Sequence, residues 1–211
     1  QVDRLVMPIW QRGLAPDPSM TVSEWSDTHR HLSQRASAEP GLWRTERTPY
    51  MRDVMDALSP SSPVERVVLQ AGAQLAKTEV GLNWLGFIID QAPGPVMLVQ
   101  PTVEMAKRVS KQRIDGMIEA TPRLREKIRP ARERDSGNTV LMKDFAGGVL
   151  VMTGANSAVG LRSMPVRYLF LDEIDGFPPD AAGEGDPVAL AEARTSTFLR
   201  RKVFMCSTPT V

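Results

Sequence analysis

Two short apolar runs, each followed by a polar cluster, constrain this chain more than any other feature. Val67-Val68-Leu69 leads into Gln70-Ala-Gly-Ala-Gln-Leu-Ala-Lys77-Thr78-Glu79 and then into a helical pattern. The second run, Val166-Arg-Tyr-Leu-Phe-Leu171, ends directly in Asp172-Glu173. A lysine that opens a helix after a strand can cradle phosphates, and carboxylates at a strand end can hold a metal ion and activate water. The two segments together predict a nucleoside triphosphate site.

The hydrophobic periodicity predicts an α/β protein. Strands are expected at 65–70, 96–99, 139–142, 149–152, 166–171 and 203–205, and the first two of them are expected to be buried. Helices are expected at 49–58, 78–91, 102–119, after 122, and from 187 to about 199. Thr48, Thr102 and Asp186 are predicted N-caps, and residues 144–148 a hairpin connection. Strands that alternate with helices favour a mostly parallel central sheet flanked by helices.

Residues 1–47 are polar and without sustained periodicity, although Trp10, Trp25 and Trp43 are scattered through them. We interpret 1–47 as an extension that packs on a core formed by 48–211, rather than as a separate domain.

Composition excludes several classes of protein. A hydrophobic content of 42% in 211 residues is enough for one sizeable core. No apolar run reaches the ~18 residues that a membrane span needs. One cysteine, Cys206, excludes an internal disulfide, and two histidines, His29 and His31, argue against a zinc site.

The net charge of +1 predicts no general attraction to nucleic acid, but the charges are unevenly placed. Residues 107–134 carry ten Lys/Arg against four Asp/Glu, and 172–192 carry seven Asp/Glu and no Lys/Arg. These segments are either a DNA-facing surface beside a metal site or two solvated faces.

The first polar cluster fits a phosphate-binding loop in part. Lys77 occupies the place of the lysine that reaches the β- and γ-phosphates, and Thr78 that of the hydroxyl that ligates Mg²⁺. Ala71 and Ala76 replace the usual glycines, and a positive φ at either would strain the loop. The alternative is an ordinary surface lysine at a helix N-terminus.

The second cluster supplies the complementary chemistry. Asp172 at a strand end can hold Mg²⁺, and Glu173 can polarise the attacking water. Ser207 and Thr208, in a segment expected to follow the last strand, can sense the γ-phosphate. The alternatives are an acidic pair of the kind common in α/β proteins and a simple turn before Pro209.

The order of these pieces resembles the ATPase domain of the large terminase subunit of tailed bacteriophages, in the lambda-type (GpA-like) branch. The matching pieces are Pro49-Tyr50-Met-Arg-Asp-Val-Met-Asp56, Ala73-Gln-Leu-Ala-Lys77-Thr78-Glu79, Val99-Gln-Pro-Thr102, Gly160-Leu-Arg162-Ser163, Leu169-Phe-Leu-Asp172-Glu173 and Ser207-Thr-Pro-Thr210. The resemblance implies a P-loop NTPase fold of the additional-strand, catalytic-glutamate type.

The resemblance also implies residue roles. Nucleotide contacts fall on Pro49, Tyr50, Gly72, Ala73, Gln74, Leu75, Ala76, Lys77, Thr78 and Glu79, with Pro49 and Tyr50 at the adenine. By the same resemblance, Mg²⁺ is held by Thr78 and Asp172. The catalytic residues are Glu173, Lys77 and Arg162, and the coupling motif is Ser207 and Thr208. Arg162 stands where relatives place an arginine that reaches a neighbouring subunit's nucleotide, and its alternative is a pair with a surface carboxylate. Ala71 and Ala73 stand where many relatives carry a basic residue.

The implied function is ATP-driven translocation of double-stranded viral DNA into a procapsid in the host cytoplasm. The implied partners are the small terminase subunit, the portal and further copies in a ring, with no membrane. The family's C-terminal nuclease is not part of the sequence, so we expect a piece of a longer protein, with nuclease activity only in the full-length form. Two alternatives stay open: a helicase-like nucleic-acid translocase, and a nucleotide-binding scaffold that does not hydrolyse.

Overall fold

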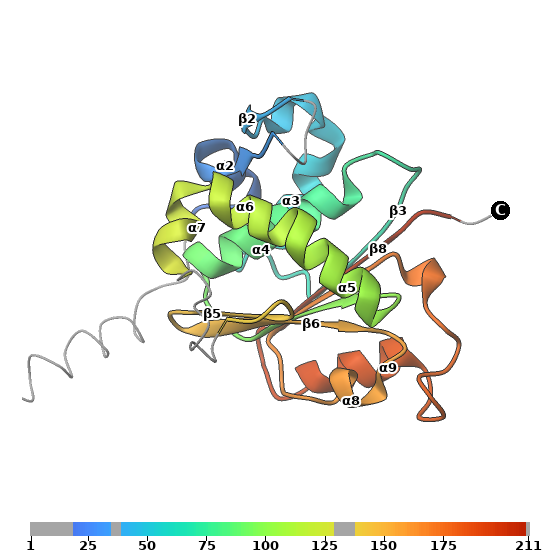
Figure 1. Cartoon of the computed structure of the whole chain (residues 1–211). Helices are drawn as coiled ribbons and strands as arrows, with labels where there is room; N and C mark the ends of the chain where they lie inside the picture. Colours follow the sequence, from blue (N-terminus) through green and yellow to red (C-terminus); the bar gives the residue numbers. More distant parts are fainter. Residues whose placement is uncertain (1–18, 35–38, 129–137, 210–211) are drawn as a thin grey trace, which may run out of the picture.

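The computed structural model describes residues 19–34, 39–128 and 138–209, and its centre is a six-stranded sheet with helices on both faces (Figure 1). In spatial order the strands are β3 (Arg66–Gln70), β8 (Lys202–Ser207), β7 (Tyr168–Asp172), β4 (Val96–Gln100), β6 (Gly148–Gly154) and β5 (Met142–Phe145). Neighbouring strands are parallel except for the β5–β6 hairpin. The predicted mostly parallel α/β architecture is therefore confirmed.

Helices cover the two faces of the sheet (Figure 1). One face carries α2 (Val22–His29), α3 (Arg52–Ala57), α4 (Lys77–Asp90), α5 (Val103–Val109), α6 (Asp115–Ala120) and α7 (Pro122–Lys127), and the other carries α8 (Ala158–Leu161) and α9 (Pro187–Glu192). Shorter turns are the 3₁₀ turns η1 (Thr45–Arg47), η2 (Pro49–Met51), η4 (Ile174–Gly176) and η5 (Ala193–Thr195), and the π-helical turn η3 (Ser110–Ile114).

The core forms because side chains of a strand alternate between the two faces. On β7, Tyr168 and Phe170 pack with α4, whereas Leu169 and Leu171 pack with residues of α8 and α9. Both faces of this strand are buried, so its sequence is a continuous apolar run rather than an alternating one.

The first strand was expected to be buried, and that prediction is wrong. Within the described residues β3 is the edge of the sheet and pairs only with β8, and Val68 is 66% exposed. An apolar run shows that a segment favours a strand, but the exposure of the strand depends on which neighbours the topology supplies.

The expected long helix from Thr102 to Glu119 is interrupted. Thr102 caps it as predicted, accepting from the N–H of Met105 at 3.2 Å. The π-helical turn η3 then adds a residue and rotates the helix face, so that Ile114 is buried and Arg113 is exposed. In a regular α-helix Arg113 would share the face of Val109 and Met117, and η3 removes it from that face.

Three other boundaries differ from expectation. Thr48 makes no side-chain cap, and η2 precedes α3. The hairpin connection is shorter, since Phe145 already pairs with Gly148 across a turn in which Gly147 has a φ of 89°. Ser207 belongs to β8 rather than following it.

The last helix is also shorter than expected. Asp186 caps α9 as predicted, but α9 ends at Glu192 instead of near residue 199. The hydroxyls of Thr195 and Ser196 donate to the carbonyls of Glu192 and Ala193, at 2.8 and 2.9 Å, and so compete with helical backbone bonds.

The described part of the N-terminal extension contains a helix that the sequence analysis missed. In α2, Thr21 and Glu24 form a reciprocal capping box, a signal present in the sequence. Trp25 is fully buried, and the small sheet of β1 (His31–Leu32) and β2 (Gly41–Leu42) follows. Trp10 lies outside the described residues. Among the helices that residues 19–34, 39–128 and 138–209 form, none is long and apolar enough to cross a membrane.

Candidate nucleotide site at the carboxyl edge of the sheet

The polar residues singled out in the sequence meet at one edge of the sheet. β3, β8 and β7 are parallel, so their carboxyl ends lie side by side. Ligands of open α/β sheets bind at this edge. The loop 71–76, the pair Asp172-Glu173 and the segment 207–208 all lie at the ends of these three strands.

The loop after β3 is closed around the ammonium group of Lys77. The Nζ atom of this buried side chain donates to the carbonyls of Ala71 and Gly72, at 2.9 and 2.7 Å. The N–H of Ala71 donates to the carbonyl of Ser207 at 3.2 Å, which ties the loop to β8. A positive charge is therefore held inside the loop at the N-terminus of α4, where the helix dipole also favours an anion.

Two residues of this loop have left-handed backbone conformations. Gln74 has a φ of 60° and Ala76 a φ of 63°. Ala76 stands at the N-cap of α4, so the strain that the sequence analysis considered for that residue is present. Ala71 has no positive φ.

The carboxylate of Asp172 is the centre of the site. Asp172 is 3% exposed, and its carboxylate accepts three side-chain hydrogen bonds. The donors are Thr78 Oγ1 at 3.4 Å, Gln100 Nε2 at 2.8 Å and Cys206 Sγ at 3.1 Å. Burial, reinforced by the carboxylate of Asp172, raises the pKa of the Cys206 thiol, which keeps it protonated and a donor. The structure thus joins Thr78 and Asp172, which are distant in sequence.

Sequence reasoning assigned no role to Gln100 or to the Cys206 side chain. Gln100 ends an apolar strand as Asp172 does, and this polar residue at a strand end was the available signal. The meaning of that signal depends on β4 lying next to β7.

Glu173 turns away from the strand direction. Its φ of 56° is left-handed, and its half-buried carboxylate accepts from the N–H of Thr208 at 3.3 Å. Ser207 Oγ accepts from the N–H of Asp175 at 3.0 Å. Glu173 and Asp175 are therefore hydrogen-bonded to Thr208 and Ser207 at the end of β8. Within the described residues, no three His, Cys, Asp or Glu side chains gather as a metal cluster.

Glu79, on the first turn of α4, links the loop to two other parts of the chain. Its carboxylate pairs with the buried Arg30, from the end of α2, at 3.3 Å and with Arg113 of η3 at 3.2 Å. Burial lowers the pKa of Arg30, and the neighbouring carboxylate opposes that shift.

Residues 37–211 match the family model of the phage terminase large subunit gpA, ATPase domain. The chain belongs to this family of terminase ATPase domains. No curated protein sequence gives a significant match.

Solved large terminases share the fold of this terminase domain. The HK97 bacteriophage large terminase has a TM-score of 0.68 at 14% identity, over 89% of this chain and 38% of that chain. The ATPase domain of the Thermus phage P74-26 large terminase has a TM-score of 0.50 at 19% identity, over 73% and 63%. A large terminase from a thermophilic bacteriophage, in complex with ADP, has a TM-score of 0.50 at 15% identity, over 83% and 38%. The chain thus spans well under half of the HK97 protein.

The other residues singled out in the sequence, Pro49, Tyr50 and Arg162, belong to other elements of the terminase domain. Pro49 and Tyr50 form η2, which leads into α3, and α3 packs against β3. Tyr50 is exposed. Arg162 ends α8 on the opposite face of the sheet, is 44% exposed, and pairs with Glu184 of its own chain. In this single chain Arg162 is therefore paired with a surface carboxylate, which is the alternative that the sequence analysis left open.

Proposed function

We propose that this domain is the ATP-hydrolysing motor of a viral DNA-packaging terminase, which translocates double-stranded DNA into a procapsid. The observation that carries the proposal is the contact between the two predicted halves of the nucleotide site. Lys77 and Thr78 open α4, Asp172 and Glu173 end β7, and Thr78 is hydrogen-bonded to Asp172.

The loop 72–79 binds the phosphates in this proposal. The Lys77 ammonium now donates to two loop carbonyls, and on ATP binding it exchanges them for phosphate oxygens. The exchange keeps the charge paired, and it orders the loop around the nucleotide. Gly72, Ala73, Gln74, Leu75 and Ala76 supply backbone, and Pro49 and Tyr50 border the adenine. Glu79 anchors the loop through Arg30 and Arg113.

Thr78 and Asp172 would hold Mg²⁺. Their oxygens lie 3.4 Å apart, and a hydroxyl beside a carboxylate is a donor set suited to this hard cation. When bound, Mg²⁺ neutralises charge on the β- and γ-phosphates. Gln100 and Cys206 hold the carboxylate of Asp172 in position by donating to it from the two neighbouring strands.

Glu173 acts as the general base that polarises the attacking water. Its left-handed backbone separates its side chain from that of Asp172, so the two carboxylates take different roles. The hydrogen bond from the N–H of Thr208 connects Glu173 to the end of β8, so a change in the position of Glu173 alters that contact. Ser207 and Thr208 are thereby the coupling segment.

Arg162 completes a neighbouring subunit's site in the assembled motor. A guanidinium stays charged and can bridge two phosphate oxygens. The motor in this proposal is a ring of copies that acts with the small terminase subunit, the portal and viral DNA in the host cytoplasm. In that ring Arg162 would leave Glu184 and contact the neighbour's nucleotide.

The assignment is tested by ATP turnover and nucleotide binding of single variants. Lys77→Ala is expected to abolish turnover and weaken binding, and Lys107→Ala, on the exposed side of α5, is the matched control. Glu173→Gln is expected to keep ATP and Mg²⁺ binding but to hydrolyse ATP roughly 10²–10⁴ times more slowly. Asp172→Asn should instead impair Mg²⁺-dependent nucleotide binding. Wild-type hydrolysis by Lys77→Ala would show that the loop is assigned wrongly.

A further inference from the structure

The two sides of the sheet carry exposed charges of opposite sign. Figure 1 shows α5 on one side of the sheet and α8 and α9 on the other. The helix formed by α5 and η3 has the exposed side chains of Arg108 and Lys111. The acidic segment, which we define as residues 175–186, packs on the side of α8 and α9 through the buried Ala181. Its exposed carboxylates are those of Asp175, Asp180, Glu184 and Asp186.

Most cations on the α5 side are already paired within the chain. Lys107 pairs with Glu104, Arg113 with Glu79, and Arg123 and Lys127 with Asp90. Arg108 and Lys111 form no ion pair with any residue that the structure describes. They are three positions apart on one helix, so their side chains are neighbours. Two adjacent positive charges are therefore available to a partner.

The acidic segment has a defined shape because two of its carboxylates hold backbone groups. The Asp180 carboxylate accepts from the N–H groups of Gly183 and Gly185. The Asp186 carboxylate caps α9. These two carboxylates shape the segment, and the other two are left for contacts outside it.

Asp175 and Glu184 are the carboxylates that a partner can reach. Among the described residues, none donates to the side chain of Asp175, and Glu184 pairs with Arg162. In the proposed function Arg162 leaves Glu184 for a neighbour's nucleotide. The acidic segment then has no cation of its own, because residues 172–192 contain no lysine or arginine. A cation from another chain would restore the pairing.

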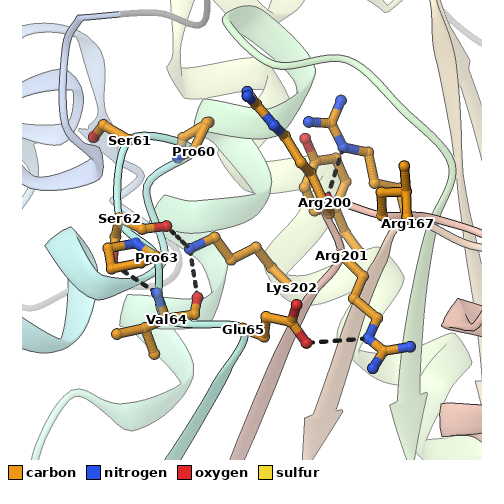
Figure 2. A pocket seen from close by; sticks show the side chains of 12 residues that line it. Pro60, Ser61, Ser62, Pro63, Val64, Glu65, Arg167, Arg200, Arg201 and Lys202 are labelled. Carbon is orange, nitrogen blue, oxygen red and sulfur yellow. Dashed lines mark hydrogen bonds and ion pairs between the residues drawn. The ribbon is translucent and has the colours of Figure 1, made fainter.

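The cations at the amino edge of the sheet are engaged within the chain. Figure 2 shows Lys202, whose ammonium donates to the carbonyls of Ser62 and Val64. Arg201 pairs with Glu65 at 3.4 Å in the same view. The complement of the acidic segment is therefore on the α5 side.

The α5 side adjoins the nucleotide site. Arg113 of η3 contacts Glu79 at 3.2 Å, and Glu79 stands in the first turn of α4, next to the phosphate loop. A copy that places its acidic segment on a neighbour's α5 and η3 therefore also brings its own Arg162 toward the neighbour's phosphate loop. Val159, which is 84% exposed and three residues before Arg162 on α8, adds an apolar side chain to the same surface.

We propose that the acidic segment of one copy docks on α5 and η3 of the next copy, where Asp175 and Glu184 pair with Arg108 and Lys111. The contact joins two different surfaces, so it repeats head to tail, as a ring requires. The proposal rests on the proposed function for the ring and for the role of Arg162, and it adds the surfaces that join the copies. Because most cations of the α5 side are already paired, this side fits a protein with matching carboxylates better than a DNA backbone.

The test is zero-length carbodiimide cross-linking, which joins a lysine to a carboxylate in contact with it. Isotope-labelled and unlabelled chains are mixed without nucleotide, and mass spectrometry identifies the cross-links that join the two isotopes. Lys111 should be joined to Asp175 or Glu184 of another chain. The ion pair of Lys107 with Glu104, at 2.9 Å, should give a cross-link within one chain and shows that the reagent works.

Exchanging the charges makes the test specific. The variants Arg108→Glu/Lys111→Glu and Asp175→Lys/Glu184→Lys should each lose the cross-link between copies, because like charges then face each other. Mixed together, the two variants should regain a cross-link between the exchanged positions, and it should join one variant to the other.

A variant with the same net charge separates this contact from a general charge effect. Arg52→Glu/Arg125→Glu changes exposed positions on α3 and α7 and should keep the cross-link of Lys111 between copies. Its loss in this control, or its absence in the wild type while Lys107 still reacts, would overturn the proposal. If the wild type gives no such cross-link and Arg108→Glu/Lys111→Glu weakens binding of a DNA duplex, the α5 side binds DNA instead.

ATP turnover is measured separately, and cross-linking does not depend on it. A wild-type chain that forms the cross-link of Lys111 between copies but does not hydrolyse ATP would count against the proposed function and not against the contact.

Discussion

At the scale of single residues, the left-handed conformation of Ala76 has a measurable consequence. A residue with a Cβ pays roughly 1–2 kcal/mol to adopt this conformation, and glycine does not. Ala76→Gly should therefore raise the free energy of unfolding by about 0.5–1 kcal/mol, and Ala76→Val should lower it by about 1–2 kcal/mol. Urea unfolding measures both.

Ala73, in the same loop and without a positive φ, provides the matched control. Ala73→Gly should lower the free energy of unfolding by about 0.4–1 kcal/mol, because it only adds freedom to the unfolded chain. If Ala76→Gly destabilised the protein as Ala73→Gly does, the left-handed geometry would be wrong.

The residues around Asp172 show what the sequence could and could not predict. Lys77, Thr78, Asp172 and Glu173 belong to polar clusters that follow apolar runs, so local pattern was enough to single them out. The contact of Gln100 with Asp172 depends on β4 and β7 being neighbours. Strand order is a property of the whole sheet, and a local pattern does not contain it.

At the scale of elements, the contact between α4 and β7 depends on a glycine. A Cβ built on Gly81 would lie 2.0 Å from the ring of Phe170, which is buried on β7. Gly81→Ala should therefore lower the free energy of unfolding by about 1–3 kcal/mol, since the helix must move off the sheet. Gly116→Ala in α6, where the nearest atom is the Ser33 hydroxyl at 3.3 Å, should be neutral or stabilising by up to about 1 kcal/mol. Equal effects of the two variants on chemical unfolding would show that the packing is looser than described.

The link between α2, α4 and α7 is electrostatic and therefore sensitive to pH. The Asp90 carboxylate accepts from Trp25 Nε1 at 2.9 Å and pairs with Arg123 and Lys127, at 3.2 and 3.4 Å. Burial raises the pKa of Asp90, but hydrogen bonds from Trp25, Gln91 and Arg123 outweigh burial and bring the pKa below its ordinary 3.8.

Because the folded pKa of Asp90 is the lower one, its contribution to stability is present above pH 3.8 and is lost as the pH falls further. Asp90→Asn should cost about 1–3 kcal/mol near neutral pH. The difference between wild type and variant in unfolding free energy should shrink in acid below that value. A difference that stayed constant down to acid unfolding would rule out an ionised Asp90 as the source.

The elements also show where periodicity misleads. The pattern of 102–119 indicates one amphipathic helix, but η3 rotates the second half of that helix. This rotation turns Arg113 outward to Glu79, while the Ser110 hydroxyl donates to the carbonyl of Val140. Both partners are distant in sequence, so a periodicity of 3.6 residues carries no sign of the extra residue.

At the scale of the whole molecule, Arg162 is the residue whose role depends on assembly. In one chain it pairs with Glu184, and in a ring we expect it to reach a neighbour's nucleotide. Arg162→Ala should leave ATP binding by a single chain intact and cut turnover of the assembled motor, by up to roughly 10³–10⁵ for a group supplied in trans.

Mixing subunits separates this role from a structural one. Arg162→Ala and Glu173→Gln chains, each inactive alone, should regain part of the turnover when combined, because each supplies the group that the other lacks. Glu184→Gln releases Arg162 without removing it and should retain turnover. An Arg162→Ala motor that assembles and hydrolyses ATP at the wild-type rate excludes the role in trans.

The outer edge of β3 has a consequence for handling the protein. Within the described residues β3 pairs on one side only, so its other side presents unpaired N–H and C=O groups next to the exposed Val68. Such an edge is a template on which a second chain can add a strand. Concentrated solutions of this 211-residue chain should therefore form dimers through β3. A lysine in place of Val68 should keep them monomeric.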